Sequence, residues 1–358
     1  MPKFFLITFI LFFNNIGKAQ ILSNTYTLEH YYRCSFEDLS NIISTNCLFK
    51  DAVFIVENTY LQNQLDKSKF SQFIEDLKGL SLSWIQYNPV KEYKYSDSIQ
   101  LKKNMALYKV FKDTIKLIST DNKSFLHIPF SYDFNDFFGN ADWKNMFVTK
   151  LLATHSGNCH SLPYLYKILA DELGAKCWLA LAPNHIYIKN RCKSICWYNT
   201  ELTSGSFPVD AWIMASGYLP LQAIQNGIYM DTLSNQECIA LCVVDLAKGY
   251  EHQTHNYFDS FIIKCCDLSL KYFPKNVQAM LLKAETLKQV FLKEQKDQFP
   301  KPTITFDEMQ DMYVKLYDLG YREMPEKMYL QWLQSVNKEK DKYSDKRLQQ
   351  TLESYKNK

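Results

Sequence analysis

The sequence has little glycine, no strongly basic segment and only one long apolar run. Glycine contributes 10 of 358 residues, while Tyr and Phe contribute 24 each. The net charge at neutral pH is +3 and no basic cluster is large, which argues against a nucleic-acid-binding protein. Because 47% of the residues are apolar and 22% are charged, the composition is globular, and the length suggests two or three domains.

The ten cysteines do not follow the spacing of a disulfide scaffold or of a metal site. Cys192 and Cys196 could bridge a hairpin. Together with His185 they lack the two-plus-two ligand spacing of a structural zinc site. We therefore expect no metal and no organic cofactor.

The N-terminus, MPKFFLITFILFFNNIGKAQ, has the pattern of a secretory signal peptide. Lys3 precedes a run from Phe4 to Phe13 that is apolar except for Thr8. Small residues then stand at 17 and 19, so we expect cleavage after Ala19, with residues 1–19 removed and the mature protein exported to the periplasm or the medium. An ordinary apolar N-terminal strand is the alternative. The run is too short to span a bilayer and no second one follows, so we expect no stable membrane span in the mature chain.

Periodicity divides the rest of the chain into three regions. Residues 20–135 predict helices, among them 98–112, with short strands at TIKLIS and SFLHIPF. Residues 136–250 predict a mixed core. Residues 251–358 return to helical spacing, and LSLKYFPKNVQAMLLKAETL within them resembles a tetratricopeptide-like helical hairpin. The two loop prolines, Pro274 and Pro325, lie further apart than that repeat requires, so plain helix pairing is the alternative.

The stretch GNCHSLPYLYKILADELG, residues 157–174, predicts a helix that begins beside a cysteine. Its leucines recur at helical spacing, and Gly174 is placed to end the helix. Pro163 lacks an N–H and belongs among the first four helical residues, which places the helix start near His160 and Cys159 at or beside the N-cap. The free N–H groups and positive dipole end of a helix favour a thiolate. Cys159 is therefore a candidate nucleophile, with a small buried residue as the alternative.

A base for such a nucleophile is offered by His185. It opens the second of three short runs, KCWLALAP, HIYIK and ICWYNTEL, that predict consecutive antiparallel strands. Asn199 and Glu201 share one face of the third strand, so a hairpin would bring one of them near His185 to orient the imidazole. His160, directly after the cysteine, could compete as the base.

The order of these residues resembles the transglutaminase-like superfamily, whose members have a papain-like core. In that family a tryptophan is followed, after three intervening residues, by Asp-Pro-Thr. Here Trp197 is followed at the same spacing by Glu201-Leu202-Thr203, which is similar to that pattern. The resemblance implies Cys159 as nucleophile, His185 as base and Glu201 as the orienting residue, with Asn199 as second choice. The strong match covers about residues 140–220. The helical flanks are similar to the bacterial branch that couples this core to tetratricopeptide repeats.

The expected fold is therefore α+β, with a transglutaminase-like core between an N-terminal helical region and a C-terminal helical-repeat domain. The expected function is that of an exported cysteine-dependent acyl-transfer enzyme. Hydrolysis of a peptide or isopeptide bond is favoured over cross-linking, because exported bacterial proteins of this fold resemble peptidases. The alternative is a non-catalytic module with a vestigial cleft that binds a protein or peptide, with a protein partner on the C-terminal helices.

Overall fold

The computed structural model describes residues 21–45, 48–89, 93–118, 124–296 and 304–353. Helices dominate and the strands form small sheets, so the mixed α and β composition predicted from the sequence is confirmed. The expected signal peptide lies outside the described residues. Within those ranges, no helix is both long enough and apolar enough to cross a membrane.

The helices are α1 (Ile21–Thr45), α2 (Phe49–Tyr60), α3 (Lys67–Tyr87), α4 (Ser98–Lys112), α5 (Val148–Thr154), α6 (Ser161–Leu173), α7 (Asp210–Ser216), α8 (Leu221–Gln225), α9 (Asn235–Thr254), α10 (Phe261–Tyr272), α11 (Val277–Lys296), α12 (Ile304–Asp318), α13 (Glu326–Lys338), α14 (Lys340–Tyr343) and α15 (Lys346–Glu353). The strands are β1 (Ile115–Ile118), β2 (Ser124–His127), β3 (Ser131–Tyr132), β4 (Ser156–Gly157), β5 (Cys177–Ala182), β6 (His185–Cys192) and β7 (Cys196–Thr200).

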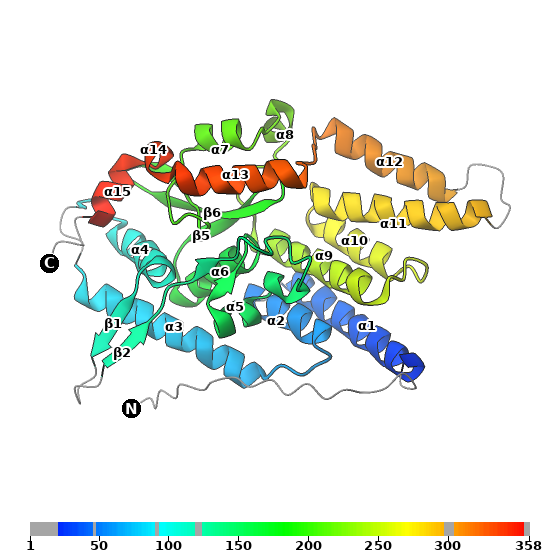
Figure 1. The fold of residues 1–358 in the computed structure, drawn as a ribbon, viewed down its shortest axis with the longest axis horizontal. Coiled ribbons are helices and arrows are strands. Elements are labelled where there is room, and N and C mark those ends of the chain that lie inside the picture. The colour runs from blue at the N-terminus through cyan, green and yellow to red at the C-terminus, as the bar shows by residue number, and fades with distance from the viewer. Residues whose placement is uncertain (1–20, 46–47, 90–92, 119–123, 297–303, 354–358) are drawn as a thin grey trace.

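Helix α6 lies at the centre and is buried along almost its whole length. Helices α3 and α4 pack against it on one side, and α5 and strand β5 also contact it (Figure 1). Pro163 is among the first residues of α6. Gly174 caps the other end of the helix in the left-handed conformation, with φ of 63°, as expected of a helix C-cap. The apolar face of α6 thus fixes the position of its N-terminus inside the molecule.

Strands β5, β6 and β7 form one antiparallel sheet in the order β5-β6-β7. Ala182 pairs with His185 at the tight turn between β5 and β6, and Lys189 pairs with Asn199 between β6 and β7. Both faces of β6 are buried except at Arg191. His185 is therefore held at the start of a strand with helices packed around it.

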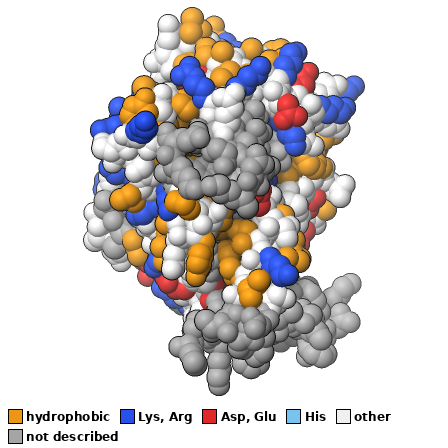
Figure 2. Space-filling model, turned by 90° about the vertical axis from the view of Figure 1, so that its left-hand side faces the viewer, with side chains coloured by type: hydrophobic (Ala, Val, Ile, Leu, Met, Phe, Trp, Pro, Cys, Tyr) orange, Lys and Arg blue, Asp and Glu red, His pale blue; other side chains and the backbone are white. Residues whose placement is uncertain are grey.

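Two further strand pairs are small. Strands β1 and β2 form an antiparallel hairpin, and β3 runs parallel to β4 just before α6. The face of the molecule that carries the hairpin exposes large apolar side chains at Ile118, Phe125, Leu126 and Ile128. Figure 2 shows apolar groups on this face beside Lys and Arg side chains.

Helices α9, α10, α11 and α12 pack one after another along the chain. A capping box at the start of α9 joins the Ser234 side chain to the Glu237 N–H and the Glu237 side chain to the Ser234 N–H. Helices α1 and α2 also pack against α9, which connects the helical stack to the N-terminal region.

Helix α13 leaves this stack and lies across the central sheet, over β6 and beside α7 (Figure 1). It is held at both ends by hydrogen bonds to neighbouring segments. The Asn184 side chain donates to the Met324 carbonyl over 2.9 Å before the helix, and the Val209 N–H donates to the Tyr343 carbonyl over 3.2 Å after it. The sequence predicted that this segment belongs to the C-terminal helical-repeat domain, whereas in the structure it covers the core.

Gly157 gives a first test of the packing at the start of α6. A Cβ at Gly157 would lie 2.3 Å from the Ser161 Oγ and 3.0 Å from the Leu151 Cδ1. Because Ser161 Oγ is itself engaged by the Asn158 N–H and the Asn145 carbonyl, it has no free direction in which to move. We expect Gly157→Ala to lower the free energy of unfolding by about 1–3 kcal/mol, measured by urea denaturation.

The matched control is Gly79→Ala. Nothing lies within 4 Å of a Cβ at Gly79, which is inside helix α3. Alanine there is expected to stabilise the protein by about 0.4–1 kcal/mol. Equal effects of the two substitutions would contradict the packing described here.

Candidate active site

Cys159 lies in the turn immediately before α6. The Asn158 side chain caps this turn, because its Oδ1 accepts the N–H groups of His160 over 3.0 Å and of Ser161 over 3.1 Å. The Asn158 amide also donates to the Phe137 carbonyl over 3.1 Å. Cys159 is thus held next to the positive end of the α6 dipole.

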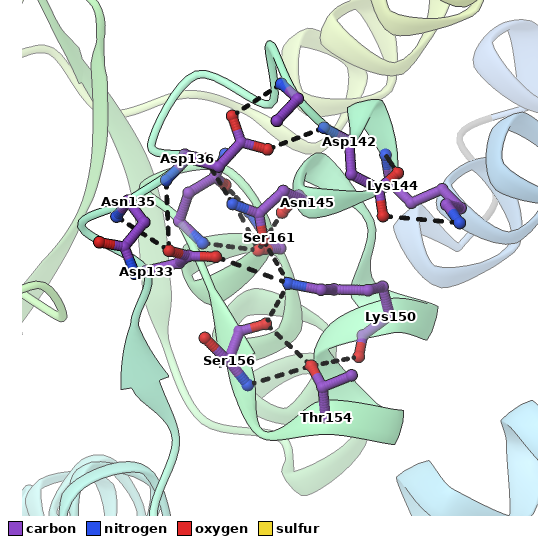
Figure 3. Close-up of polar contacts among 12 residues, drawn as sticks. Asp133, Asn135, Asp136, Asp142, Lys144, Asn145, Lys150, Thr154, Ser156 and Ser161 are labelled. Atoms are coloured by element: carbon purple, nitrogen blue, oxygen red, sulfur yellow. Dashed lines mark hydrogen bonds and ion pairs between the residues drawn. The ribbon is translucent and has the colours of Figure 1, made fainter.

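The segment around this turn is fixed by a polar network that Figure 3 shows. Lys150 Nζ donates to the Ser156 carbonyl over 3.2 Å and lies 3.9 Å from the Asp133 Oδ2. The Ser161 hydroxyl donates to the Asn145 carbonyl over 3.1 Å. The network therefore ties the loop after β3, helix α5 and the first turn of α6 into one unit.

Three of the four residues that the sequence singled out converge, and a tyrosine joins them. His185 Nε2 lies 2.7 Å from the Glu201 Oε2. His185 Nδ1 lies 3.1 Å from the Tyr329 hydroxyl, which donates over 3.1 Å to the Cys159 sulfur. The order Glu201, His185, Tyr329, Cys159 forms one hydrogen-bonded chain in which the phenol bridges the imidazole and the thiol.

The charged forms of Cys159, His185 and Glu201 stabilise one another. Burial raises the pKa of the Cys159 thiol, but hydrogen bonding and positive charge from His185, with the Tyr329 hydroxyl, outweigh it and lower the pKa overall. Burial lowers the pKa of His185, but the Glu201 carboxylate outweighs it and raises the pKa to about 10. Because of His185, the pKa of Glu201 is lowered in spite of its burial. These directions favour the charged form of each group: thiolate, imidazolium and carboxylate.

Other buried cysteines behave in the opposite way. Burial raises the pKa of Cys238 to about 12, and it also raises the pKa values of Cys177, Cys242, Cys265 and Cys266. None of the nine cysteines within the described ranges forms a disulfide, Cys192 and Cys196 included. Cys159 therefore differs from the other buried thiols through its charged partner.

Glu201 follows β7 and is positioned by its own loop. Its backbone pairs with Ser206, with hydrogen bonds of 2.9 and 3.1 Å, and its Oε1 accepts the Thr203 N–H over 2.8 Å. If the β6–β7 register is extended past Lys189 and Asn199, Glu201 becomes a diagonal neighbour of His185, within reach of a long side chain. The glutamate side chain is long enough to span this diagonal and reach the imidazole.

Asn199 does not contact the imidazole. Its amide donates to the Pro208 carbonyl over 2.9 Å and to the Asp210 Oδ1 over 2.7 Å. Lys189 lies opposite it in the sheet. Of the two orienting residues that the sequence left open, the structure brings Glu201 to His185 and keeps Asn199 two positions away, where it ties β7 to the start of α7.

His160 is held in a separate network. Its Nδ1 lies 2.9 Å from the Met146 carbonyl and its Nε2 lies 3.0 Å from the Asp245 Oδ2, which also accepts the Tyr164 hydroxyl over 2.9 Å. Burial lowers the pKa of His160, but Asp245 outweighs it and raises the pKa overall. With both ring nitrogens engaged, His160 supplies positive charge near Cys159 and has no free lone pair to act as a base.

The sequence reading missed Tyr329 and Trp332 of α13. The Trp332 ring packs edge-on against the His185 ring at 4.7 Å, and the Phe138 ring stacks on Tyr329 at 5.1 Å. Tyr329 is fully buried and Cys159 is 8% exposed. An i, i+3 aromatic pair was the only sequence signal, and such a pair is common in ordinary helix packing.

A pocket of about 480 Å³ opens beside the thiol. Cys159 and His185 line it, and so do Gln278, Leu281 and Glu285 of helix α11. Aromatic side chains contribute much of its wall: Phe137, Phe138, Trp143, Phe147, Tyr164 and Tyr229. The pocket is therefore shared by the region around Cys159 and the helical stack, so a ligand bound there would touch both regions.

Among the described residues, no group of three or more His, Cys, Asp and Glu side chains is arranged to hold a metal ion. Comparisons with protein-family models, with curated proteins and with solved structures returned no match. The chemistry of the site therefore has to be inferred from its own geometry.

Proposed function

We propose that the protein is a cysteine-dependent acyl-transfer enzyme with a papain-like, transglutaminase-like core, which hydrolyses peptide or isopeptide amide bonds. The observation that carries the proposal is the hydrogen-bonded chain that ends on Cys159, combined with the lowered pKa of its thiol. The order of a cysteine at a helix start, a histidine on a strand and an acid after the next strand supports this core. The apolar pocket beside the thiol offers space for a peptide side chain.

In the proposed reaction, the Cys159 thiolate attacks the carbonyl carbon of the amide. A carbon–sulfur bond forms, and the electron pair of the carbonyl double bond moves to oxygen. His185 then gives its Nδ1 proton to the leaving amine, and the carbon–nitrogen bond breaks to leave a thioester. Water, deprotonated by His185, hydrolyses the thioester. Glu201 holds the ring and stabilises the imidazolium throughout.

The reaction requires Tyr329 to move. Its hydroxyl is hydrogen-bonded to both the sulfur and the imidazole, whereas a scissile carbonyl must approach the sulfur to about 3–3.5 Å. Asn184 and Ser216 hold α13 at this place through hydrogen bonds to Met324 and Trp332. We infer that binding of a substrate in the adjoining pocket displaces the phenol.

The contact of the Tyr329 hydroxyl with Cys159 and His185 also favours a second candidate function. Because Tyr329 engages both reactive groups and is fully buried, the site could be a vestigial cleft in a module that binds a protein or peptide. The exposed apolar side chains Ile304, Val314 and Tyr317 on α12 would then offer a partner surface on the helical stack. In either case we propose that the chain is exported, which an N-terminus at Gln20 in the mature protein would verify.

Profiling with a peptide library decides between the two candidates. Wild-type protein and Cys159→Ala are incubated with the same mixed peptides, and new termini are identified by mass spectrometry. Cleavage that is present in the wild type and absent in Cys159→Ala is expected of the enzyme. Identical peptide patterns, with peptides retained by both proteins, would instead identify the binding module.

A further inference from the structure

Tyr132 carries a buried hydroxyl that has no partner within ordinary hydrogen-bond distance. It is one of four such side-chain atoms among the described residues, the others belonging to Tyr187, Asn190 and Asn199 in the central sheet. A buried donor without a partner destabilises the folded protein, because it has lost its hydrogen bonds to water. An acceptor that arrives with a ligand would remove that cost.

The backbone places Tyr132 beside the nucleophile. Strand β3 runs parallel to β4 with Tyr132 opposite Gly157, two residues before Cys159. The Asp133 N–H donates to the Gly157 carbonyl over 2.7 Å. Lys150 connects both strands through the Ser156 carbonyl and the Asp133 carboxylate (Figure 3). This network fixes Tyr132 and Cys159 relative to each other.

The hydroxyl of Tyr132 lies near the Cys159 sulfur and the Tyr329 hydroxyl, since both influence its pKa. Burial and then the negative charge of Cys159 raise the pKa of Tyr132, and the Tyr329 hydroxyl is also among its neighbours. The phenol therefore keeps its proton at neutral pH and remains a donor. The Cys159 N–H is a second donor nearby, since the Asn158 side chain takes the N–H groups of His160 and Ser161 instead.

We propose that the Tyr132 hydroxyl, with the Cys159 N–H, binds the oxyanion formed when Cys159 attacks a carbonyl group. This inference rests on the proposed function and adds a catalytic residue to it. When the carbon–sulfur bond forms, the electron pair of the carbonyl double bond moves to oxygen, and Tyr132 donates to that oxygen. When the intermediate collapses, the pair returns and the leaving group departs. A donor that gains its acceptor only in the intermediate stabilises the transition state selectively.

Two reagents separate this role from thiol activation. Iodoacetamide alkylates the sulfur by displacement and forms no oxyanion. With p-nitrophenyl acetate the thiolate attacks the ester carbonyl, an oxyanion forms, p-nitrophenolate leaves and an acetyl thioester remains. We expect Tyr132→Phe to lower the rate of Cys159-dependent nitrophenolate release by about 10²–10³-fold, and to change the rate of Cys159 alkylation by less than about twofold.

Three variants serve as controls. Cys159→Ala supplies the background rate of nitrophenolate release. Tyr329→Phe removes the hydroxyl bonded to the sulfur, so it is expected to slow alkylation at pH 6, unlike Tyr132→Phe. Tyr87→Phe alters an exposed tyrosine and is expected to leave both rates unchanged.

An unchanged ester rate in Tyr132→Phe would overturn the inference, as would an equal loss of both rates, which would indicate a structural role. If wild-type protein releases nitrophenolate no faster than Cys159→Ala, the proposed function fails and the inference fails with it. These outcomes are distinguishable because only the last one concerns the wild-type protein.

Discussion

Replacing His185 with Ala is expected to lower Cys159-dependent nitrophenolate release from p-nitrophenyl acetate by about 10²–10⁴-fold, the range supplied by a positioned acid–base group. The substitution removes the positive charge that offsets the burial of Cys159. The thiol then stays protonated at neutral pH, because burial alone raises its pKa. Part of the lost rate should return in alkaline buffer, where hydroxide deprotonates the thiol without help.

His160→Gln is the matched control, because His160 is the other imidazole near Cys159. Its nitrogens are engaged by Met146 and Asp245, and it contributes only charge to the thiol. We expect a loss of less than about tenfold. A loss as large as that of His185→Ala would identify His160 as the base and contradict the assignment made here.

Replacing Glu201 with Gln is expected to lower the free energy of unfolding at pH 7 by about 3–5 kcal/mol, the usual effect of removing one partner of a buried ion pair. The pKa of Glu201 is lowered in the folded protein, so its contribution is present above its ordinary value of 4.5 and lost as the pH falls. The pKa of His185 is raised to about 10, so its contribution is complete below 6.5 and lost as the pH rises through 10.

The difference in stability between wild type and Glu201→Gln should therefore be largest between about pH 4.5 and pH 6.5, decrease as the pH rises above 6.5 and be mostly lost at pH 10.5. Urea denaturation at pH 7 and pH 10.5 measures it. Glu75→Gln, at an exposed position on α3, is expected to change stability by less than about 0.5 kcal/mol. If Glu201→Gln lowers the free energy of unfolding by the same amount at pH 7 and at pH 10.5, the contact with His185 is not ionic.

Local patterns predicted several helices and the position of Cys159 just before α6. The apolar spacing of residues 98–112 gave the bounds of α4, and Pro163 fixed the start of α6 close to Cys159. Both predictions depend only on residues within a single helix. Glu201 and Asn199 could not be separated, because they share a strand face and the choice depends on the β6–β7 register and on the loop that ends in Ser206.

Contacts between residues far apart in the sequence could not be predicted from local sequence patterns. Tyr329 lies 170 residues from Cys159, and its helix has the same apolar spacing as any helix of a repeat. Only the path of α13 across the sheet shows that its apolar face covers the site. Tyr132 was hidden for a similar reason, since a two-residue parallel pairing with Gly157 has no sequence signature.

The most direct test of the account is the rate of iodoacetamide alkylation of each cysteine as a function of pH, followed by peptide mass spectrometry. Cys159 lines the pocket beside His185, while Cys34 and Cys196 are exposed thiols on the surface. At pH 6 we expect Cys159 to react faster than Cys34 and Cys196, because its thiol has a lowered pKa. Slower reaction of Cys159 than of both surface cysteines at pH 6, with acceleration only in strongly alkaline buffer, would contradict it.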